Sequence, residues 1–373
     1  MHAAFTRCRQ PDNPRGLLWV DVLITRVLAK LEPGGAQLSL LRVARALAAR
    51  GHDTRLLVGF ATPEGIELAR AHGIEPEVMP GGRNVQWRCD PAFADWLRPR
   101  LLDADLVHAH MFGAWWAAAR VMPAETPLFA SEHNDYAWPE AEHWSEMADA
   151  VGRVDRFYAH SPGARAGVLK AGMGEDRIVV GVSPVDGLDA VARPGLPRPR
   201  IVYTGRLTED KGPDVLVEAI GLMAAPPQVL MLGAGVLEPQ LRARIDALAL
   251  RDVIELLGWQ EDPGTFVAGS AIQVCPSRDE AFSQAAVLAM GLGVPVVGTR
   301  VDGFPVTLAK GRGLIVEAGD PAALATALQD LLDGRRRTDV IGARAWAQQY
   351  ALVRVTSRYE DDYLDRVVPL AAA

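Results

Sequence analysis

Three residues of this 373-residue chain, Arg206, Lys211 and Glu280, have the types and the spacing that chemistry on a phosphate-linked substrate needs. Arg206 and Lys211 follow Ile201–Tyr203, an apolar run that predicts a buried strand. Two fixed cations in such a loop suit a diphosphate, because both carry positive charge and the forked guanidinium of Arg donates paired hydrogen bonds. Glu280 lies in a polar loop before a helix expected over about Ser283–Gly291, whose first N–H groups and dipole also favour an anion. We therefore expect a diphosphate site here, against the alternative that both cations are simply solvated.

Histidines mark the ends of three predicted strands. His108 and His110 end the first of them, His133 follows the second, and His160 follows the third. Ligands of open α/β sheets bind at the carboxyl ends of strands, so His110 is a candidate for contact with a substrate. One alternative is that the histidines only hydrogen-bond within the fold. Another is a metal site assembled from separate loops, although the spacings do not match a zinc sequence pattern.

The elements that must position these residues alternate between apolar strand patterns and amphipathic helix patterns, which is typical of parallel sheets wound with helices. The first strand is expected over Leu17–Leu28, and a loop with Gly34 and Gly35 leads from it into a helix. A stretch rich in Pro and Gly divides the alternation into two halves. We expect an α/β protein with an N-terminal domain over residues 17–183, a linker over 184–199, a C-terminal domain over 200–343 and a terminal helix over 344–373.

Composition excludes several classes of function. The formal net charge is −7, which argues against a nucleic-acid partner and does not favour an anionic membrane. No apolar run approaches the roughly 20 residues of a membrane span, and the first 16 residues read as an extension without the apolar core of a signal peptide. Cys8, Cys89 and Cys275 lie far apart, which fits a reducing cytoplasm and predicts neither a disulfide nor a metal framework.

Taken together, a series of short motifs resembles a retaining family-4 glycosyltransferase (glycosyl transferases group 1). The matching residues are, in chain order, Pro33–Gln37, Val107–His110, Ser131–Asn134, Gly205–Leu207, Lys211-Gly212, Gly233 with Gly235, Pro276–Phe282 and Ala289–Val297. The resemblance covers roughly residues 17 to 335, in order and at the expected spacing. It implies the GT-B fold, in which two Rossmann-like domains face each other across a cleft and the terminal helix crosses back to the N-terminal domain.

The resemblance also implies a hexosyltransferase that uses a nucleotide sugar, a UDP- or GDP-sugar, as co-substrate and needs neither a cofactor nor a metal. The acceptor would be a hydroxyl group on a glycan, a lipid-linked molecule or a small molecule. The catalytic residues implied are His110, Glu280, Arg206 and Lys211. The donor-binding residues implied are Arg206, Lys211 and Glu280, together with Gly34, Gly35, Gly235, Val253, Phe282 and Ser283. The candidates on the acceptor side are Gln37, Glu132, His133 and Asn134.

One departure from the family pattern matters for function. The second Glu of the family's Glu–seven residues–Glu motif falls at Leu288, and the usual glycine after the first Glu is Ala281. Another group could hold the ribose, the donor could be unusual, or the protein could bind a nucleotide sugar without transferring it. The last of these, a non-catalytic relative, is the alternative function. Trp115 and Trp116 either pack in the core or stack on sugars and touch a membrane surface weakly.

Overall fold

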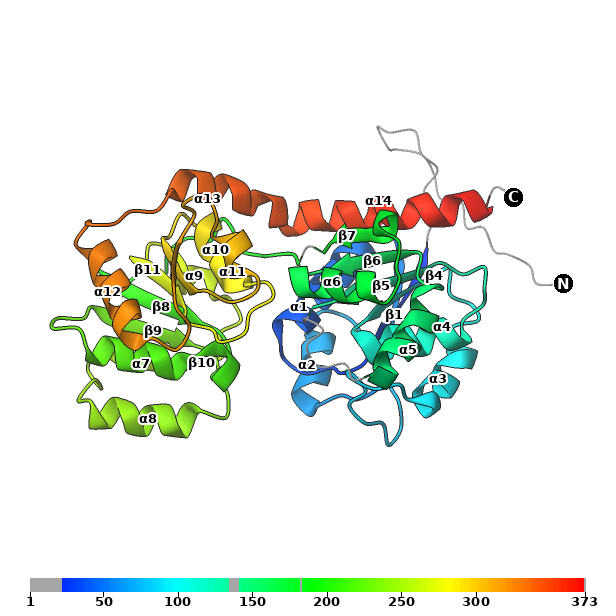
Figure 1. Ribbon diagram of the computed structural model, residues 1–373, viewed down its shortest axis with the longest axis horizontal. Helices are drawn as coiled ribbons and strands as arrows, with labels where there is room; N and C mark the ends of the chain where they lie inside the picture. The colour runs from blue at the N-terminus through cyan, green and yellow to red at the C-terminus, as the bar shows by residue number, and fades with distance from the viewer. Residues whose placement is uncertain (1–21, 134–140, 182, 372–373) are drawn as a thin grey trace. The chain divides into compact units, whose positions relative to one another are not determined.

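The computed structural model describes residues 22–133, 141–181 and 183–371 of the chain. It divides into two compact units (Figure 1). Unit 1 combines Met1–Val182 with Leu352–Ala373, and unit 2 is Ser183–Ala351. The predicted linker therefore belongs to unit 2, and the chain returns to unit 1 at its end.

Unit 1 is built on a seven-stranded sheet in which every neighbouring pair of strands is parallel. Its strands are, in spatial order, β3 (Pro76–Val78), β2 (Asp53–Val58), β1 (Leu23–Leu28), β4 (Leu106–His110), β5 (Leu128–Glu132), β6 (Arg156–Ala159) and β7 (Ile178–Val180). The central strands β4 and β5 are buried along their whole length, which is typical of a parallel sheet covered on both faces. The strand expected over Leu17–Leu28 is described only from Leu23 onward, because residues 1–21 lie outside the described part of the chain.

Helices connect these strands. They are α1 (Gly35–Ala48), α2 (Pro63–Ala71), α3 (Pro91–Leu97), α4 (Phe112–Val121), α5 (Ala141–Val151) and α6 (Pro162–Lys170). Trp115 and Trp116 of α4 are buried in the core of unit 1, and Trp116 Nε1 donates to Glu146 Oε2 at 2.8 Å. The core alternative is therefore confirmed for both, and neither side chain is exposed for a sugar or a membrane.

Unit 2 repeats the architecture with a six-stranded parallel sheet. Its strands are, in spatial order, β10 (Ile254–Gly258), β9 (Gln228–Leu232), β8 (Arg200–Thr204), β11 (Ile272–Cys275), β12 (Val296–Thr299) and β13 (Leu314–Val316). Its helices are α7 (Pro213–Gly221), α8 (Glu238–Ala247), α9 (Gly264–Val267), α10 (Gln284–Gly291), α11 (Phe304–Thr307), α12 (Pro321–Leu332) and α13 (Val340–Ala347). The prediction of two Rossmann-like α/β domains is confirmed.

The end of the chain differs from the single helix expected from Arg344 onward. Helix α13 ends at Ala347, and a separate helix α14 covers Leu352–Ala371. The break follows from local pairing: the carbonyl oxygen of Tyr350 accepts from Val185 N at 2.8 Å, so it is not available to continue a helix. Helix α14, red in Figure 1, packs on α1 within unit 1.

Strand order locates the places where ligands of such sheets bind. In each sheet the connections reverse direction once, between β1 and β4 in unit 1 and between β8 and β11 in unit 2. The crevice at the carboxyl ends of strands, at this switch point, is the usual ligand site of open α/β sheets. The predicted catalytic residues lie at these two points: His110 ends β4, Arg206 and Lys211 follow β8, and Glu280 follows β11.

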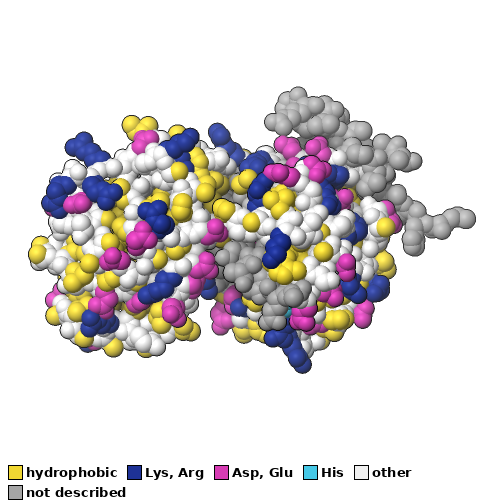
Figure 2. All heavy atoms as spheres, viewed as in Figure 1, with side chains coloured by type: hydrophobic (Ala, Val, Ile, Leu, Met, Phe, Trp, Pro, Cys, Tyr) yellow, Lys and Arg dark blue, Asp and Glu magenta, His cyan; other side chains and the backbone are white. Residues whose placement is uncertain are grey.

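The surface carries charges of both signs. On the face drawn in Figure 2, basic and acidic side chains are interspersed over both units. In the described ranges, no cluster of three or more His, Cys, Asp or Glu side chains is arranged to hold a metal ion. Within the same ranges, every helix is too short or too polar to cross a bilayer.

Candidate functional site

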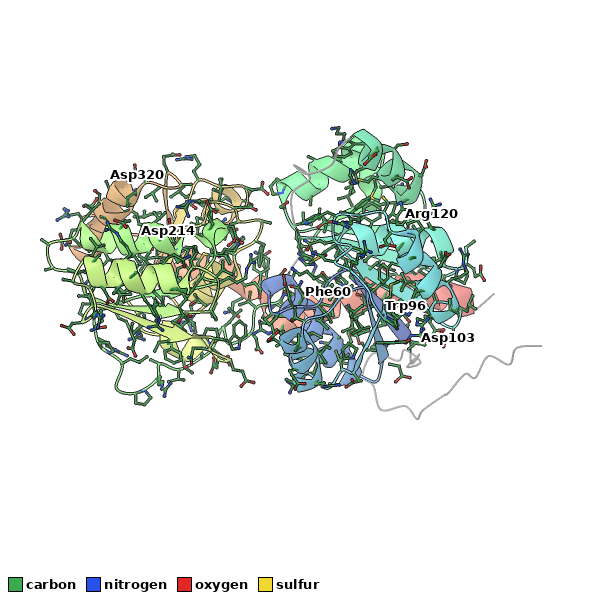
Figure 3. All side chains as sticks on the ribbon, turned by 90° about the horizontal axis from the view of Figure 1, so that it is seen from below. Phe60, Trp96, Asp103, Arg120, Asp214 and Asp320 are labelled. Atoms are coloured by element: carbon green, nitrogen blue, oxygen red, sulfur yellow. The ribbon has the colours of Figure 1, made fainter. Side chains whose placement is uncertain are left out.

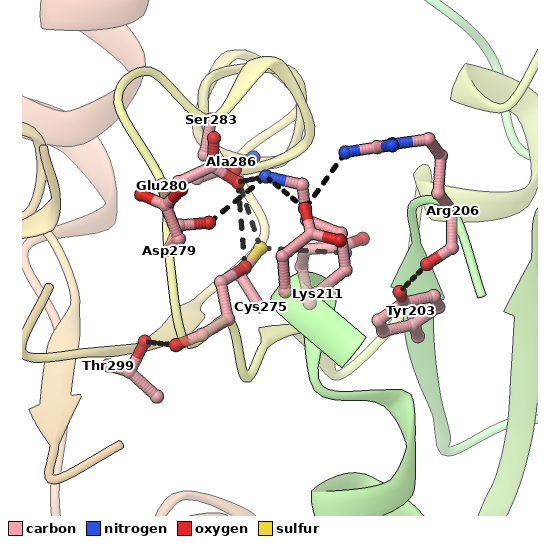
Figure 4. Close-up of polar contacts among 12 residues, drawn as sticks. Tyr203, Arg206, Lys211, Cys275, Asp279, Glu280, Ser283, Ala286 and Thr299 are labelled. Atoms are coloured by element: carbon pink, nitrogen blue, oxygen red, sulfur yellow. Dashed lines mark hydrogen bonds and ion pairs between the residues drawn. The ribbon is translucent and has the colours of Figure 1, made fainter. Parts of the chain in front are cut away.

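The switch point of unit 2 brings Lys211 and Glu280 into direct contact (Figure 4). Lys211 Nζ lies 3.2 Å from Glu280 Oε2 and donates to the carbonyl oxygen of Asp279 at 3.1 Å. Ser277 Oγ donates to the same Glu280 oxygen at 3.5 Å, and the Ser277 carbonyl accepts from Thr299 Oγ1 at 2.5 Å. The sequence predicts that Lys211 and Glu280 lie at the same edge of a sheet. In the structure they form an ion pair, and the side chain of Glu280 is only 12% exposed.

Arg206 occupies the outer side of the same site. Its carbonyl oxygen accepts from the Tyr203 hydroxyl at 2.5 Å, which fixes the backbone of the loop after β8. Its guanidinium extends to Asp210, with Nη2 2.8 Å from Oδ2, and is about half exposed. Asp210 also lies 3.7 Å from Lys211 Nζ. Arg206 and Lys211 are therefore both paired with carboxylates of the protein. An incoming diphosphate would have to compete with Asp210 for these two side chains.

A second set of contacts ties the loop of Glu280 to the loop of Lys211. Arg278 forms a two-armed ion pair with Asp214 at the start of α7, at 2.8 and 2.6 Å (Asp214 is labelled in Figure 3). The carbonyl oxygen of Asp210 accepts from the backbone N–H of Arg278 at 2.7 Å and of Asp279 at 3.2 Å. Because an Arg–carboxylate fork is geometrically specific, it holds the two loops in one register. Asp214 could not be predicted because its partner Arg278 is 64 residues away, and Asp210 was not predicted although its side chain pairs with Arg206 only four residues away.

Gly233 and Gly235, which follow β9, lie in close contact with the backbone of the loop after β8. A Cβ atom at Gly235 would lie 2.4 Å from the carbonyl oxygen of Leu207, and one at Gly233 would lie 1.8 Å from that of Gly205. The loop after β9 therefore packs directly on the loop that carries Arg206. The structure gives Gly235, predicted at the donor, this role of close approach.

Replacing Gly233 by Ala should destabilise unit 2 strongly. Gly233 has φ +138°, and an added methyl group would meet a backbone oxygen that cannot move alone. We expect the free energy of unfolding to fall by about 3 kcal/mol or more in chemical denaturation. Gly319→Ala is the matched control, because Gly319 has φ +74° but no atom within 4 Å of the added Cβ; it should cost about 1 kcal/mol. Equal losses in the two variants would show that the close approach is unimportant.

Helix α10 begins directly after the loop of Glu280. Ser283 is its N-cap, and Ser283 Oγ accepts from Ala286 N at 3.3 Å, close to the predicted helix start. Ser283 Oγ also lies 3.8 Å from Cys275 Sγ, and burial raises the pKa of this thiol to about 12, so Cys275 is inert at neutral pH. Phe282 packs on Tyr350, with ring centroids 5.0 Å apart. The predicted donor residues Phe282 and Ser283 thus lie at the start of this helix.

Two positions that the family pattern assigns to the donor, Leu288 and Val253, carry apolar side chains. Leu288, where the family pattern has its second Glu, is 5% exposed in α10, and its Cδ1 lies 3.8 Å from the Cβ that Gly187 would carry. An apolar side chain fills this place. Val253 precedes β10 and packs against the core at the amino end of the strand. Gly258, which pairs with Gly233, is the part of this segment at the carboxyl edge, and the assignment of Val253 to the donor site stays a prediction.

The switch point of unit 1 holds a column of imidazoles. The ring of His110 stacks on that of His108, with centroids 4.2 Å apart, and on that of His133 at 6.0 Å. His133 in turn stacks on His160 at 4.0 Å. A Cβ at Gly181 would lie 2.6 Å from the His160 ring, so only glycine leaves room for the column. Burial lowers the pKa of all four histidines below the usual range, to about 4 for His133, so the rings are neutral at pH 7.

The remaining predicted residues of unit 1 differ in their surroundings. Gly34 is the N-cap of α1. Gln37 is buried and its Nε2 donates to the carbonyl of Lys30 at 3.3 Å, so the structure gives it a role inside the fold. Glu132 ends β5 fully buried, with Oε1 accepting from His133 N at 3.0 Å. Asn134 lies outside the described residues.

Comparison with protein families gives two matches. The model described as Glycosyltransferase Family 4 matches residues 33–186, within unit 1 and its boundary. The model described as Glycosyl transferases group 1 matches residues 198–334, which contain the site of Lys211 and Glu280.

Individual relatives agree with these matches. A phosphatidyl-myo-inositol mannosyltransferase of Mycobacterium leprae is 31% identical, over 86% of this chain and 89% of its own length. A D-inositol 3-phosphate glycosyltransferase of Streptomyces avermitilis is 30% identical, and the match spans 61% of this chain but only 58% of that protein. Among solved structures, Anabaena HepE in complex with UDP has a TM-score of 0.74 at 21% identity, covering 91% of this chain and 98% of that chain. These similarities cover both halves of the chain.

Proposed function

Because the chain belongs to glycosyltransferase family 4, we propose that it transfers a sugar from a nucleotide-diphosphate sugar to a hydroxyl-bearing acceptor with retention of the anomeric configuration. The observation that carries this proposal is the arrangement at the switch point of unit 2. There Lys211 and Arg206 lie beside Glu280 at the start of α10. The two cations and the start of the helix suit a leaving diphosphate, and the carboxylate of Glu280 suits the sugar that it leaves.

The proposed chemistry follows from where charge develops. When the bond between the sugar and the diphosphate breaks, the sugar carbon becomes cation-like and the diphosphate gains negative charge. Lys211 and Arg206 stabilise the diphosphate, and they are already held in place by Asp210, Glu280 and the carbonyl of Asp279. In this proposal Glu280 contacts the donor sugar and His110 supplies a neutral imidazole near the reacting carbon. The two cations supply the positive charge for the departing diphosphate, so no metal is required.

The proposed donor is a UDP- or GDP-sugar. A structural neighbour has been crystallised with UDP-glucose, which supports a uridine nucleotide. The names of the relatives refer to inositol phosphates and phosphatidylinositol, so a cyclitol hydroxyl is one acceptor within the proposed class. A reducing, cytoplasmic location is part of the proposal, supported by Cys89 and Cys275, which are both free thiols.

The test is thermal stabilisation by a panel of UDP-, GDP-, ADP- and dTDP-sugars. A ligand at 100 times its Kd adds about 2.7 kcal/mol to the free energy of unfolding of the form that it binds. We expect a shift with one nucleotide family, which Arg206→Ala abolishes. Arg242→Ala is the matched control. Arg242 is 58% exposed, against 49% for Arg206, and it also pairs with a carboxylate four residues away, Glu238, but it lies on α8. No shift with any sugar nucleotide, together with no turnover, would overturn the proposed function.

A non-catalytic relative is the second candidate, and Leu288 is the observation that favours it. The family's second Glu is replaced by a buried leucine, which removes a polar anchor for the ribose. In that case the protein would bind the nucleotide sugar without releasing nucleotide. A thermal shift without any release of UDP or GDP, in the presence of candidate acceptors, would support this candidate over transfer.

A further inference from the structure

His110 is held by stacking alone in this structure. Both of its ring nitrogens are buried, and neither has a hydrogen-bond partner among the described residues. Its plane is set by the neighbouring rings, above all by His108, which lies 4.2 Å away and is inclined by 22°. Whatever fixes the ring of His108 therefore also fixes the ring that the proposed function places next to the reacting sugar.

His108 is fixed by two hydrogen bonds, one of them from the last helix of the chain. Its Nδ1 lies 2.5 Å from the hydroxyl of Tyr363 in α14, and its Nε2 lies 2.8 Å from Ser131 Oγ at the end of β5. The side chains of His108 and Tyr363 are almost fully buried. Burial lowers the pKa of His108, so that the ring is neutral and one nitrogen must accept while the other donates.

The buried Arg26 decides which nitrogen accepts. Arg26 lies on β1 directly beside His108, and its positive charge is close enough to act on the Tyr363 hydroxyl. A nearby positive charge favours the orientation in which the hydroxyl oxygen faces Arg26 and its single proton points to His108 Nδ1. His108 must then carry its own proton on Nε2 and donate it to Ser131. Tyr363, His108 and Ser131 then form one chain of hydrogen bonds with a single direction.

We propose that Tyr363 is a positioning residue for sugar transfer: it holds His108 in the Nε2–H tautomer and in the plane on which His110 is stacked. This rests on the role given to His110 in the proposed function. It makes α14, which follows unit 2 in the sequence, a structural part of the site in unit 1. Tyr363 touches no reacting atom and acts only through His108.

The test compares two buried tyrosines that each lose one hydroxyl group. Tyr363→Phe removes the bond to His108, whereas Tyr158→Phe removes a bond to Asp362 of the same helix, at 2.6 Å, and keeps both hydrogen bonds of His108 and the ring that packs on it. We expect kcat to fall about tenfold in Tyr363→Phe, with the KM for the donor within twofold of wild type, because the donor cations lie in unit 2. Tyr158→Phe should keep the wild-type kcat. An unchanged kcat in Tyr363→Phe, or an equal fall in both variants, would overturn the proposal.

A second measurement does not depend on activity. In protein with ¹⁵N-labelled histidine, the ring shifts of His108 should show a bare Nδ1 and a protonated Nε2, with the resonance assigned by its loss in His108→Gln. In Tyr363→Phe the two tautomers should mix, and in Tyr158→Phe they should not. A protonated Nδ1 in the wild type would overturn the proposal even if Tyr363→Phe failed to fold. If the protein turned over no nucleotide sugar, the proposed function would be overturned. The ring shifts would still show which nitrogen of His108 carries the proton.

Discussion

Replacing Lys211 by Ala should lower kcat for sugar transfer about a hundred- to a thousand-fold, since a preorganised donor aimed at developing charge is typically worth that much. Lys211 is only 22% exposed, and it contacts Glu280 and the carbonyl oxygen of Asp279. Its ammonium group is therefore in place before the diphosphate arrives, and its charge is screened less than that of a freely solvated lysine. The measurement is release of nucleotide from the donor under saturating conditions, which reports kcat directly.

Two controls separate charge stabilisation from damage to the loop. Arg242→Ala removes an exposed, ion-paired cation of the same unit and should leave kcat unchanged. Lys211→Ala combined with Glu280→Gln removes the uncompensated carboxylate that Lys211→Ala alone leaves behind, and its reference is Glu280→Gln, because Glu280 itself is proposed to contact the donor sugar. If the double variant were as active as Glu280→Gln, Lys211 would serve only to neutralise Glu280. A wild-type kcat in the single variant would remove Lys211 from the mechanism.

The sequence predicted both switch points because parallel sheets obey a simple geometric rule. Polar residues that directly follow apolar strands, such as His110, Arg206 and Glu280, must meet at the carboxyl edge of a sheet. The start of α10 was predicted as well, since Ser283 is a preferred N-cap residue. The motif order then identified the family, which the comparisons confirm.

Contacts between distant parts of the chain could not be predicted in this way. Tyr363 and His108 are 255 residues apart, and neither the helix pattern nor the strand pattern contains the partner. The stacking of His133 on His160 likewise depends on the space left by Gly181. The strand pattern around Val253 shows that the segment is buried, but it does not show that Val253 lies at the amino end of the strand.

The column of histidines should make unit 1 labile to acid. Burial holds the pKa values of His108, His110, His133 and His160 below about 6.5, the value expected in the unfolded chain. Between the folded and unfolded pKa values the unfolded chain binds more protons, so the free energy of unfolding is fully present above pH 6.5 and decreases as the pH falls. His133 alone, with a pKa of about 4, accounts for a loss of about 2 kcal/mol at pH 5. The lowered pKa values of His108, His110 and His160 act in the same direction and add to this loss.

Unit 2 provides an internal control for this prediction, because all eight histidines of the chain lie in the sequence range of unit 1 and residues 183–351 contain none. Hydrogen exchange followed by mass spectrometry at pH 7, 6 and 5, corrected for the intrinsic exchange rate, reports the two units separately. Peptides from β4, β5 and β6 should lose protection steeply below pH 6.5, while those from β8 and β11 keep it. An equal loss in both units would point to carboxylates instead, and stable protection of β4 at pH 5 would mean that the folded state accepts protons on these rings. The same acid lability in unit 1 would also reduce sugar transfer at low pH.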